Sequence, residues 1–166
     1  DHAGWRAPRP PARRAGALRG RGMGLARYKN SGAWCAVVIE AEVAERLWLE
    51  RVWVVVDAGE VVNPDGLVNQ IEGGVLQAAS WTLKEAVTWG PQGSTTRSWA
   101  DYPMLGFDEL PRTLQVKLLT DPQQPPLGVG ECAAGPTAAA TAIALADALG
   151  LRVRDLPLSA ERLARA

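Results

Sequence analysis

A chain of 166 residues, of which 47% are apolar, is long enough to bury the core of one folded domain, so a disordered chain is not expected. The formal net charge is zero, but residues 1–30 carry eight basic side chains against the single acidic Asp1, which leaves the remainder acidic. No apolar run approaches the roughly 18 residues needed to cross a bilayer, so no membrane span is expected.

The first part of the chain, residues 1–30, is predicted to be a basic linker rich in proline and glycine. An anionic partner is the alternative reason for its charge. Neither interleaved aromatic residues nor a recognition helix accompanies that charge, so no nucleic-acid partner is expected. The segment Gly20-Arg21-Gly22-Met23-Gly24 has the glycines of a nucleotide loop, but no predicted strand leads into it and a strand rather than a helix follows.

The next segments predict a β-hairpin followed by a helix. Residues 33–43 are rich in β formers and alternate partly at period two, and residues 47–57 alternate around their valines. Asn63 and Pro64 are the residue types of an N-cap and a first helical position. A helix is therefore predicted from there to about Leu83.

The second half of the chain predicts shorter strands and a second long helix. Strand-like pieces flank a turn at residues 90–93, and residues 114–119 indicate another strand. Pro136 begins an alanine-rich helix that ends at Gly150, and a short helix lies near the C-terminus. The predicted fold class is α+β, with mostly antiparallel strands packed with two main helices.

A first candidate motif lies inside the predicted helix: Gln70-Ile71-Glu72-Gly73-Gly74. Glycines inside a helix cost about 1 kcal/mol each against alanine, so the close approach of another group to the backbone is a natural explanation. Gln70 lies one turn earlier and faces broadly the same way, and its amide can both donate and accept hydrogen bonds. The alternative is an exposed polar face with tight helix packing.

A second candidate motif, Gly128-Val129-Gly130-Glu131, lies just before the alanine-rich helix. It presents a carboxylate between flexible backbone positions and close to a helix N-terminus, where N–H groups and a positive dipole end are available. From the residues alone, Glu131 is more often a cap or dipole partner than a catalytic base.

The cysteine and histidine content predicts no protein-ligated metal. Cys35 and Cys132 are far apart and form neither a disulfide framework nor a CxxC pattern. His2 has no second histidine with which to form a metal site or a catalytic pair.

In chain order, several motifs resemble landmarks of the last domain in the large subunit of molybdenum hydroxylases, the xanthine dehydrogenase and aldehyde oxidase family. The likeness covers about Gly20 to the C-terminus and is strongest to the bacterial branch typified by isoquinoline 1-oxidoreductase and nicotinate dehydrogenase subunits. Besides the two motifs above, its landmarks are Val56-Asp57-Ala58-Gly59, Val62-Asn63-Pro64, Asp101-Tyr102-Pro103, Pro125-Pro126 and Arg154-Asp155-Leu156-Pro157-Leu158.

The resemblance implies that residues 31–166 are the C-terminal portion of the second molybdopterin cofactor-binding domain. It implies Glu131 as the general base of a molybdenum-dependent hydroxylation that uses oxygen derived from water. The cofactor-binding residues that it implies are Gln70, Gly73, Gly74, Gly128, Val129 and Gly130. Molybdenum would be held by the pterin rather than by protein ligands. Cys132 departs from the pattern, since relatives often carry proline, alanine or another small residue there.

The resemblance also implies partners. These are the remaining domains of the large subunit, a small subunit with iron–sulfur clusters, and an N-heterocycle or aldehyde as substrate. The pterin has the cytosine dinucleotide form as one option, and the compartment is the bacterial cytoplasm or periplasm. The alternative function is a truncated, non-catalytic structural module or remnant that needs a partner chain to complete the cofactor site.

Overall fold

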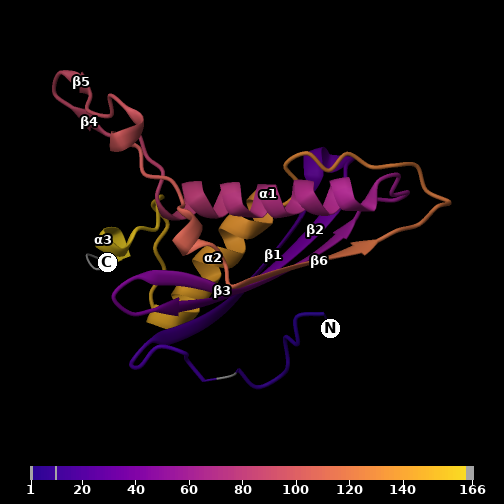
Figure 1. Cartoon of the computed structure of the whole chain (residues 1–166), viewed down its shortest axis with the longest axis horizontal. Helices are drawn as coiled ribbons and strands as arrows, with labels where there is room; N and C mark the ends of the chain where they lie inside the picture. The colour runs from indigo at the N-terminus through magenta and orange to yellow at the C-terminus, as the bar shows by residue number, and fades with distance from the viewer. Residues whose placement is uncertain (1, 10, 164–166) are drawn as a thin grey trace.

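The computed structural model describes residues 2–9 and 11–163. Its centre is a four-stranded sheet in the order β1-β2-β3-β6, and both long helices lie on one face of that sheet (Figure 1). The elements are β1 (Leu18–Arg27), β2 (Trp34–Val43), β3 (Leu47–Asp57), β6 (Thr113–Leu119), α1 (Pro64–Leu83) and α2 (Ala134–Leu149). The α+β class and the mostly antiparallel sheet are confirmed.

The strand pairing follows from the connections. A short turn joins β2 to β3, and these strands pair antiparallel, as do β1 and β2. The pair β3 and β6 is parallel, because the chain returns to the sheet through a crossover that contains α1. The predicted alternation in β3 is present, with Val52, Val54 and Val56 buried against the helices.

Helix α1 begins and ends where its sequence predicts. The Asn63 side chain accepts a hydrogen bond from the Gly66 backbone N–H at 2.9 Å, and Pro64 occupies the first helical position. A buried stripe that includes Leu67, Ile71 and Val75 holds the helix on the core. The opposite face, which carries Gln70, is exposed.

Helix α2 begins two residues before the predicted Pro136, at Ala134. Proline is tolerated there because the first backbone N–H groups of a helix have no partner within it. The helix ends before Gly150, whose φ of 71° is the left-handed conformation that glycine adopts without steric cost.

The predicted linker is wrong for residues 18–27, which form edge strand β1. Gly20, Gly22 and Gly24 alternate on the face that contacts α2. A Cβ atom on Gly22 would lie 2.0 Å from the carbonyl oxygen of Ala140. The glycines therefore bring strand and helix backbones together rather than loosening the chain. Asp1 and Pro10 of the predicted linker lie outside the described residues.

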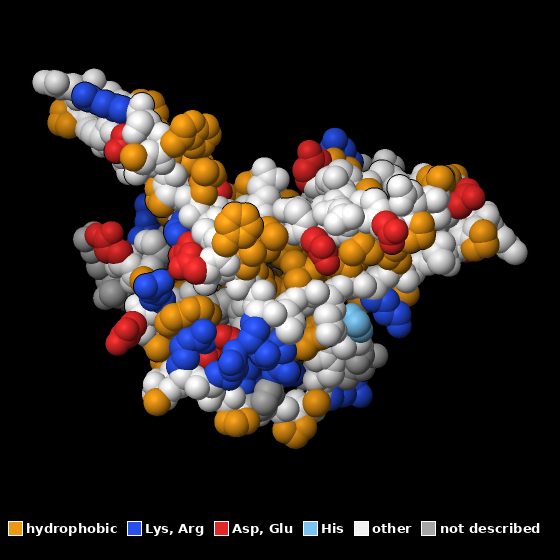
Figure 2. Space-filling model, in the orientation of Figure 1, with side chains coloured by type: hydrophobic (Ala, Val, Ile, Leu, Met, Phe, Trp, Pro, Cys, Tyr) orange, Lys and Arg blue, Asp and Glu red, His pale blue; other side chains and the backbone are white. Residues whose placement is uncertain are grey.

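The opposite face of the sheet carries a buried ionic cluster beneath the N-terminal segment. Glu40, Glu42 and Glu50 are at most 2% exposed. Burial raises the pKa of Glu40, but hydrogen bonds and charges from Arg21 and Arg51 outweigh it and lower the pKa overall. In Figure 2 basic side chains gather around acidic ones below the helices.

An arm of residues 84–110 extends from the end of α1 (Figure 1, upper left). It contains the two-stranded hairpin of β4 (Trp89–Gly90) and β5 (Gly93–Ser94), followed by the 3-10 turns η2 (Trp99–Asp101) and η3 (Phe107–Glu109). The Ser80 hydroxyl accepts a hydrogen bond from the Leu105 N–H at 2.9 Å at the base of the arm. The short helix α3 (Ala160–Leu163) ends the described part, in which no helix is long and apolar enough to cross a membrane.

Candidate functional site

The two candidate motifs meet at one cavity between α1 and the loop that precedes α2. Its volume is about 350 Å³, and its lining residues are Asn69, Gln70, Gly73, Gly74, Gln77, Trp81, Gly130, Glu131 and Ala134. Gln70 Nε2 donates a hydrogen bond to the Gly130 carbonyl oxygen at 2.8 Å, which ties the two motifs together. Five of the seven predicted site residues therefore lie around a single space.

The other two predicted residues lie beside this cavity. Val129 lines a neighbouring cavity of about 270 Å³, which Gln70 also borders. Gly128 belongs to neither lining, and its carbonyl oxygen accepts a hydrogen bond from the Ala33 N–H at 2.9 Å. In this structure both residues therefore hold the loop rather than face the larger cavity.

The glycines of α1 leave the helix backbone open to the cavity. A Cβ atom on Gly73 would meet nothing within 4 Å, and one on Gly74 would make an ordinary contact of 3.6 Å with Ala133. Tight packing within this chain therefore does not account for Gly73. Its absent side chain keeps space open on the cavity side of the helix.

The Glu131 carboxylate is exposed, and Tyr28 Oη donates a hydrogen bond to its Oε2. The hydrogen bond from Tyr28 lowers the pKa of Glu131 and desolvation opposes the change, while the charge of Lys29 and a backbone hydrogen bond from Glu131 itself add to the lowering. The carboxylate is therefore ionised at neutral pH, which is the form that accepts a proton.

Cys132, the departure from the family pattern, points into the core. It is 3% exposed and lies against Cys35 of β2, and both are free thiols. The hydrogen bond with Cys132 and burial both raise the pKa of Cys35, so this thiol stays protonated. Cys132 thus anchors the end of the loop without entering the cavity. Within residues 2–9 and 11–163, no group of three or more His, Cys, Asp or Glu side chains is placed to hold a metal ion.

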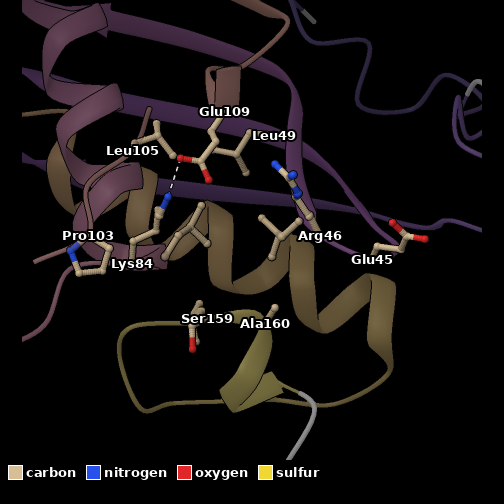
Figure 3. Close-up of a pocket in the computed structure, with 12 residues that line it drawn as sticks. Glu45, Arg46, Leu49, Lys84, Pro103, Leu105, Glu109, Ser159 and Ala160 are labelled. Atoms are coloured by element: carbon tan, nitrogen blue, oxygen red, sulfur yellow. Dashed lines mark hydrogen bonds and ion pairs between the residues drawn. The ribbon is translucent and has the colours of Figure 1, made fainter. Parts of the chain in front are cut away.

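A different cavity, of about 270 Å³, lies at the far end of α1 (Figure 3). Apolar side chains such as Leu49 and Leu105 line much of it, and an ion pair of 2.5 Å joins Lys84 to Glu109 at its edge. None of the predicted site residues reaches it.

The sequence predictions missed four lining residues, Asn69, Gln77, Trp81 and Ala134, and also Tyr28, which contacts Glu131 without lining the cavity. Gln77 and Trp81 follow Gln70 and Gly73 at helical spacing, so periodicity along α1 was a usable signal for them. Tyr28 had no such signal, because it lies 103 residues from Glu131 in the chain and fell within the predicted linker. Its role depends on how β1 and β2 are placed beside α2.

Residues 21–111 match the family described as molybdopterin cofactor-binding domain. The chain belongs to this family. The matched range begins inside the predicted linker, at β1, and ends before the Gly128 motif.

Individual relatives extend the likeness beyond that range. A nicotinate dehydrogenase subunit of Pseudomonas putida is 43% identical over 88% of this chain and 13% of its own length. The beta subunit of isoquinoline 1-oxidoreductase of Brevundimonas diminuta is 34% identical over 88% of this chain and 19% of its own. The predicted membership of the molybdenum hydroxylase family is confirmed, and the chain spans less than a fifth of these relatives.

A solved structure gives the same result for the fold. Quinoline 2-oxidoreductase from Pseudomonas putida 86 superposes with a TM-score of 0.73 at 26% identity, over 80% of this chain and 18% of that one. Quinoline 2-oxidoreductase and the two relatives above are each named after a nitrogen heterocycle, which is quinoline, nicotinate or isoquinoline.

The cavity at Gln70 and Glu131 fits one edge of a molybdopterin. A pterin edge presents both donors and acceptors, and the side-chain amides of Asn69, Gln70 and Gln77 can supply either. The open helix backbone at Gly73 admits a flat group without steric conflict. These residues have the hydrogen-bonding groups and the open space that one wall of such a site requires.

Proposed function

We propose that this chain supplies one wall of the molybdopterin site in a molybdenum-dependent oxidoreductase that hydroxylates an N-heterocycle or an aldehyde, with Glu131 as general base. One observation carries the proposal. An amide and an ionised carboxylate, from motifs 61 residues apart (131 − 70), border the same open cavity of about 350 Å³. The heterocycle names of three matching proteins favour an N-heterocycle as substrate.

Glu131 accepts a proton in this proposal. When bound, the cofactor supplies a two-electron acceptor and a Lewis acid that makes water a nucleophile near neutral pH. The ionised carboxylate of Glu131 removes the proton from that water-derived nucleophile as it attacks the substrate carbon. A carboxylate with a lowered pKa is a weak base, but it is ionised in nearly every molecule at neutral pH.

Gln70 has two tasks in this proposal. Its Nε2 is engaged by the Gly130 carbonyl, so it fixes the loop that carries Glu131. Its Oε1 remains to accept a hydrogen bond from the pterin edge. Gly73 and Gly74 admit the cofactor to the helix backbone, while Gly128 and Val129 hold the loop from behind.

Further subunits complete the enzyme in this proposal. Two relatives are named as one subunit of several, and the chain spans 13% and 19% of their lengths. We assign the remaining large-subunit domains to the other walls of the cavity and an iron–sulfur subunit to electron removal, with the pterin in its cytosine dinucleotide form. Release of CMP on acid hydrolysis of the purified complex would support this form, and its absence would exclude it. A bacterial cytoplasmic or periplasmic location stays a prediction.

The second candidate is a structural module that completes a partner's cavity without catalysis. The exposure of Glu131 favours it, since a catalytic base usually works where water is excluded. Molybdenum and pterin content of material purified from the native host separates the two. Near-stoichiometric molybdenum and pterin in a larger complex would support the catalytic role. A folded chain that copurifies with neither molybdenum nor pterin would support the structural module.

Glu131→Gln in the complete complex tests the base. We expect kcat to fall by about a hundredfold or more, because general-base catalysis contributes roughly that much, while molybdenum content stays unchanged. Glu85→Gln is the matched control, since Glu85 also accepts a hydrogen bond from a tyrosine but lies in the arm. Near-normal turnover of Glu131→Gln would exclude the proposed role.

A further inference from the structure

The turn between β1 and β2 has an unusual backbone. Lys29 and Asn30 are consecutive non-glycine residues with φ of 45° and 60°. Asparagine adopts this left-handed region readily, but it is uncommon for lysine, and such conformations cluster at functional sites. Two backbone hydrogen bonds close the turn: Gly32 N–H donates to the Tyr28 carbonyl at 2.7 Å, and Tyr28 N–H donates to the Ala33 carbonyl at 2.9 Å.

This turn contacts both ends of the Gly128 motif. Ala33 N–H donates to the Gly128 carbonyl at 2.9 Å, and Tyr28 Oη donates to the Glu131 carboxylate. The ring of Tyr28 lies so close that a Cβ atom on Gly130 would stand 2.9 Å from its hydroxyl oxygen. A side chain at Gly130 would therefore displace the Tyr28 hydroxyl, while Gly128 has open space around it.

The loop is thus held from two directions. Gln70 of α1 binds the Gly130 carbonyl on the cavity side, and the β1–β2 turn binds the Glu131 carboxylate. The charged or titratable groups that face this carboxylate from the turn are Tyr28 and Lys29. Helix α1 contributes amides and an indole to the cavity lining and no charge.

We propose that Tyr28 is the positioning residue of Glu131: its hydroxyl holds Oε2 and thereby fixes where the carboxylate points across the cavity. This inference rests on the proposed function, in which Glu131 is the general base. The hydrogen bond also stabilises the charged form of the carboxylate, and the positive charge of Lys29 acts in the same direction.

The hydroxyl of Tyr28 can be separated from its structural role. The backbone hydrogen bonds of the turn do not involve the side chain, and the ring packs against Gly130 without needing the hydroxyl. Tyr28→Phe keeps the ring and the turn and removes the hydroxyl, which donates to Glu131 and also interacts with Lys29. A purely structural tyrosine predicts no change in how Glu131 titrates.

The first experiment is a carboxyl ¹³C NMR titration of the full 166-residue chain. In the wild type we expect Glu131 to titrate below the ordinary glutamate range, and in Tyr28→Phe we expect its pKa to rise. The matched control is Tyr102→Phe, which removes the hydroxyl that donates to Glu85 at 2.9 Å in the arm and should leave Glu131 unchanged. An identical Glu131 titration in wild type and Tyr28→Phe overturns the proposal.

Two further measurements keep the test decisive if Tyr28→Phe does not fold. Wild-type Glu131 that titrates at or above the ordinary glutamate value overturns the proposal without any variant. Lys29→Gln removes the neighbouring charge and leaves the hydroxyl, so we expect a rise in the pKa of Glu131 that is smaller than that in Tyr28→Phe. A larger rise in Lys29→Gln would assign the effect to the charge and overturn the role of Tyr28.

The complete complex supplies the second readout. A general base must be ionised, so kcat/KM falls as pH drops through its pKa. Tyr28→Phe should lower kcat/KM by about tenfold, the scale of one lost charge-assisted hydrogen bond, and should shift the acid limb to higher pH with unchanged molybdenum content. An acid limb at the wild-type pH would overturn the positioning role.

The two proposals fail in different ways. If Glu131→Gln remains active, Glu131 is not the base, yet the NMR titration still reports whether Tyr28 holds it. If Glu131→Gln is inactive but Tyr28→Phe leaves the Glu131 titration and the acid limb of kcat/KM unchanged, the role of Glu131 as base is supported and the positioning role of Tyr28 is excluded.

Discussion

Glutamate side chains on the two sides of the sheet have contrasting environments. Glu40, on the face covered by the N-terminal segment, is 1% exposed and lies among the guanidinium groups of Arg19, Arg21 and Arg51. Glu131, beyond the helix-covered face, is exposed and accepts a hydrogen bond from the neutral hydroxyl of Tyr28. The pKa of both carboxyl groups is lowered. At Glu40, burial raises the pKa, but the guanidinium groups of Arg21 and Arg51 outweigh it; at Glu131, the hydroxyl of Tyr28 has the largest effect. Burying a carboxylate costs free energy of desolvation that neighbouring positive charges must offset. An exposed carboxylate stays hydrated, needs no such charges, and remains available to react.

Glu40→Gln should give the largest loss of stability. The substitution leaves the buried Arg21 without its counterion, and breaking a buried pair costs about 3–5 kcal/mol of unfolding free energy. Urea unfolding of the chain measures the loss. Glu60→Gln, at an exposed position, is the control and should change stability by less than about 0.5 kcal/mol. An unfolding midpoint equal to that of the wild type would mean that the cluster does not depend on this carboxylate.

Glu131→Gln should leave the midpoint of urea unfolding nearly unchanged. The same chemical change would then lower stability at Glu40 and activity at Glu131.

The two glycine-rich segments extend the contrast from charge to space. A Cβ atom on Gly22 of β1 would lie 2.0 Å from a backbone carbonyl of α2, whereas one on Gly73 of α1 would meet nothing within 4 Å. One glycine therefore serves packing within the chain. The other leaves space that the described residues do not fill.

Gly22→Ala should destabilise the chain by about 1–3 kcal/mol, because the added methyl group forces β1 and α2 apart and backbone atoms cannot rotate away. Urea unfolding measures this loss too. Ala26→Gly on the same strand is a control for propensity alone and should cost less, about 1 kcal/mol or below. A wild-type midpoint for Gly22→Ala would show that the strand and the helix are not in contact in solution.

The contrast also explains what the sequence predicted well. Helix α1 has a local signal at its start, the Asn63 cap followed by Pro64, so its first residue was predicted correctly, and its end at Leu83 also agrees with the prediction. Strand β1 was missed because the proline and arginine content suggested a linker. The informative signal was glycine at every second residue, which places three small residues on one face of a strand.

Only those residues of the candidate site that belong to local sequence motifs could be predicted. Gln70, Gly73 and Glu131 stood out by residue type and order, and the structure brings them to one cavity. The parallel pairing of β3 with β6 and the contact of Tyr28 with Glu131 depend on segments far apart in the chain. Neither leaves a local pattern, so only the folded structure reveals them.

Gly73→Ala should have the smallest effect on stability and should change it in the opposite direction. Alanine is favoured over glycine inside a helix, and its methyl group has open space here, so we expect a gain of up to about 1 kcal/mol in urea unfolding. In the complete complex the same methyl group would stand where the cofactor meets α1, so bound molybdopterin should decrease. Pterin fluorescence and elemental analysis measure that decrease.

Gly135→Ala is the matched control for Gly73→Ala, since it adds the same group to open space on a helix but outside the cavity lining. It should leave the cofactor content at the wild-type level. If Gly73→Ala also keeps full cofactor content, the open backbone of α1 is not where the cofactor lies. The contrast between the two glycine-rich segments would then reflect packing alone, and Gln70 would act only through the loop that it holds.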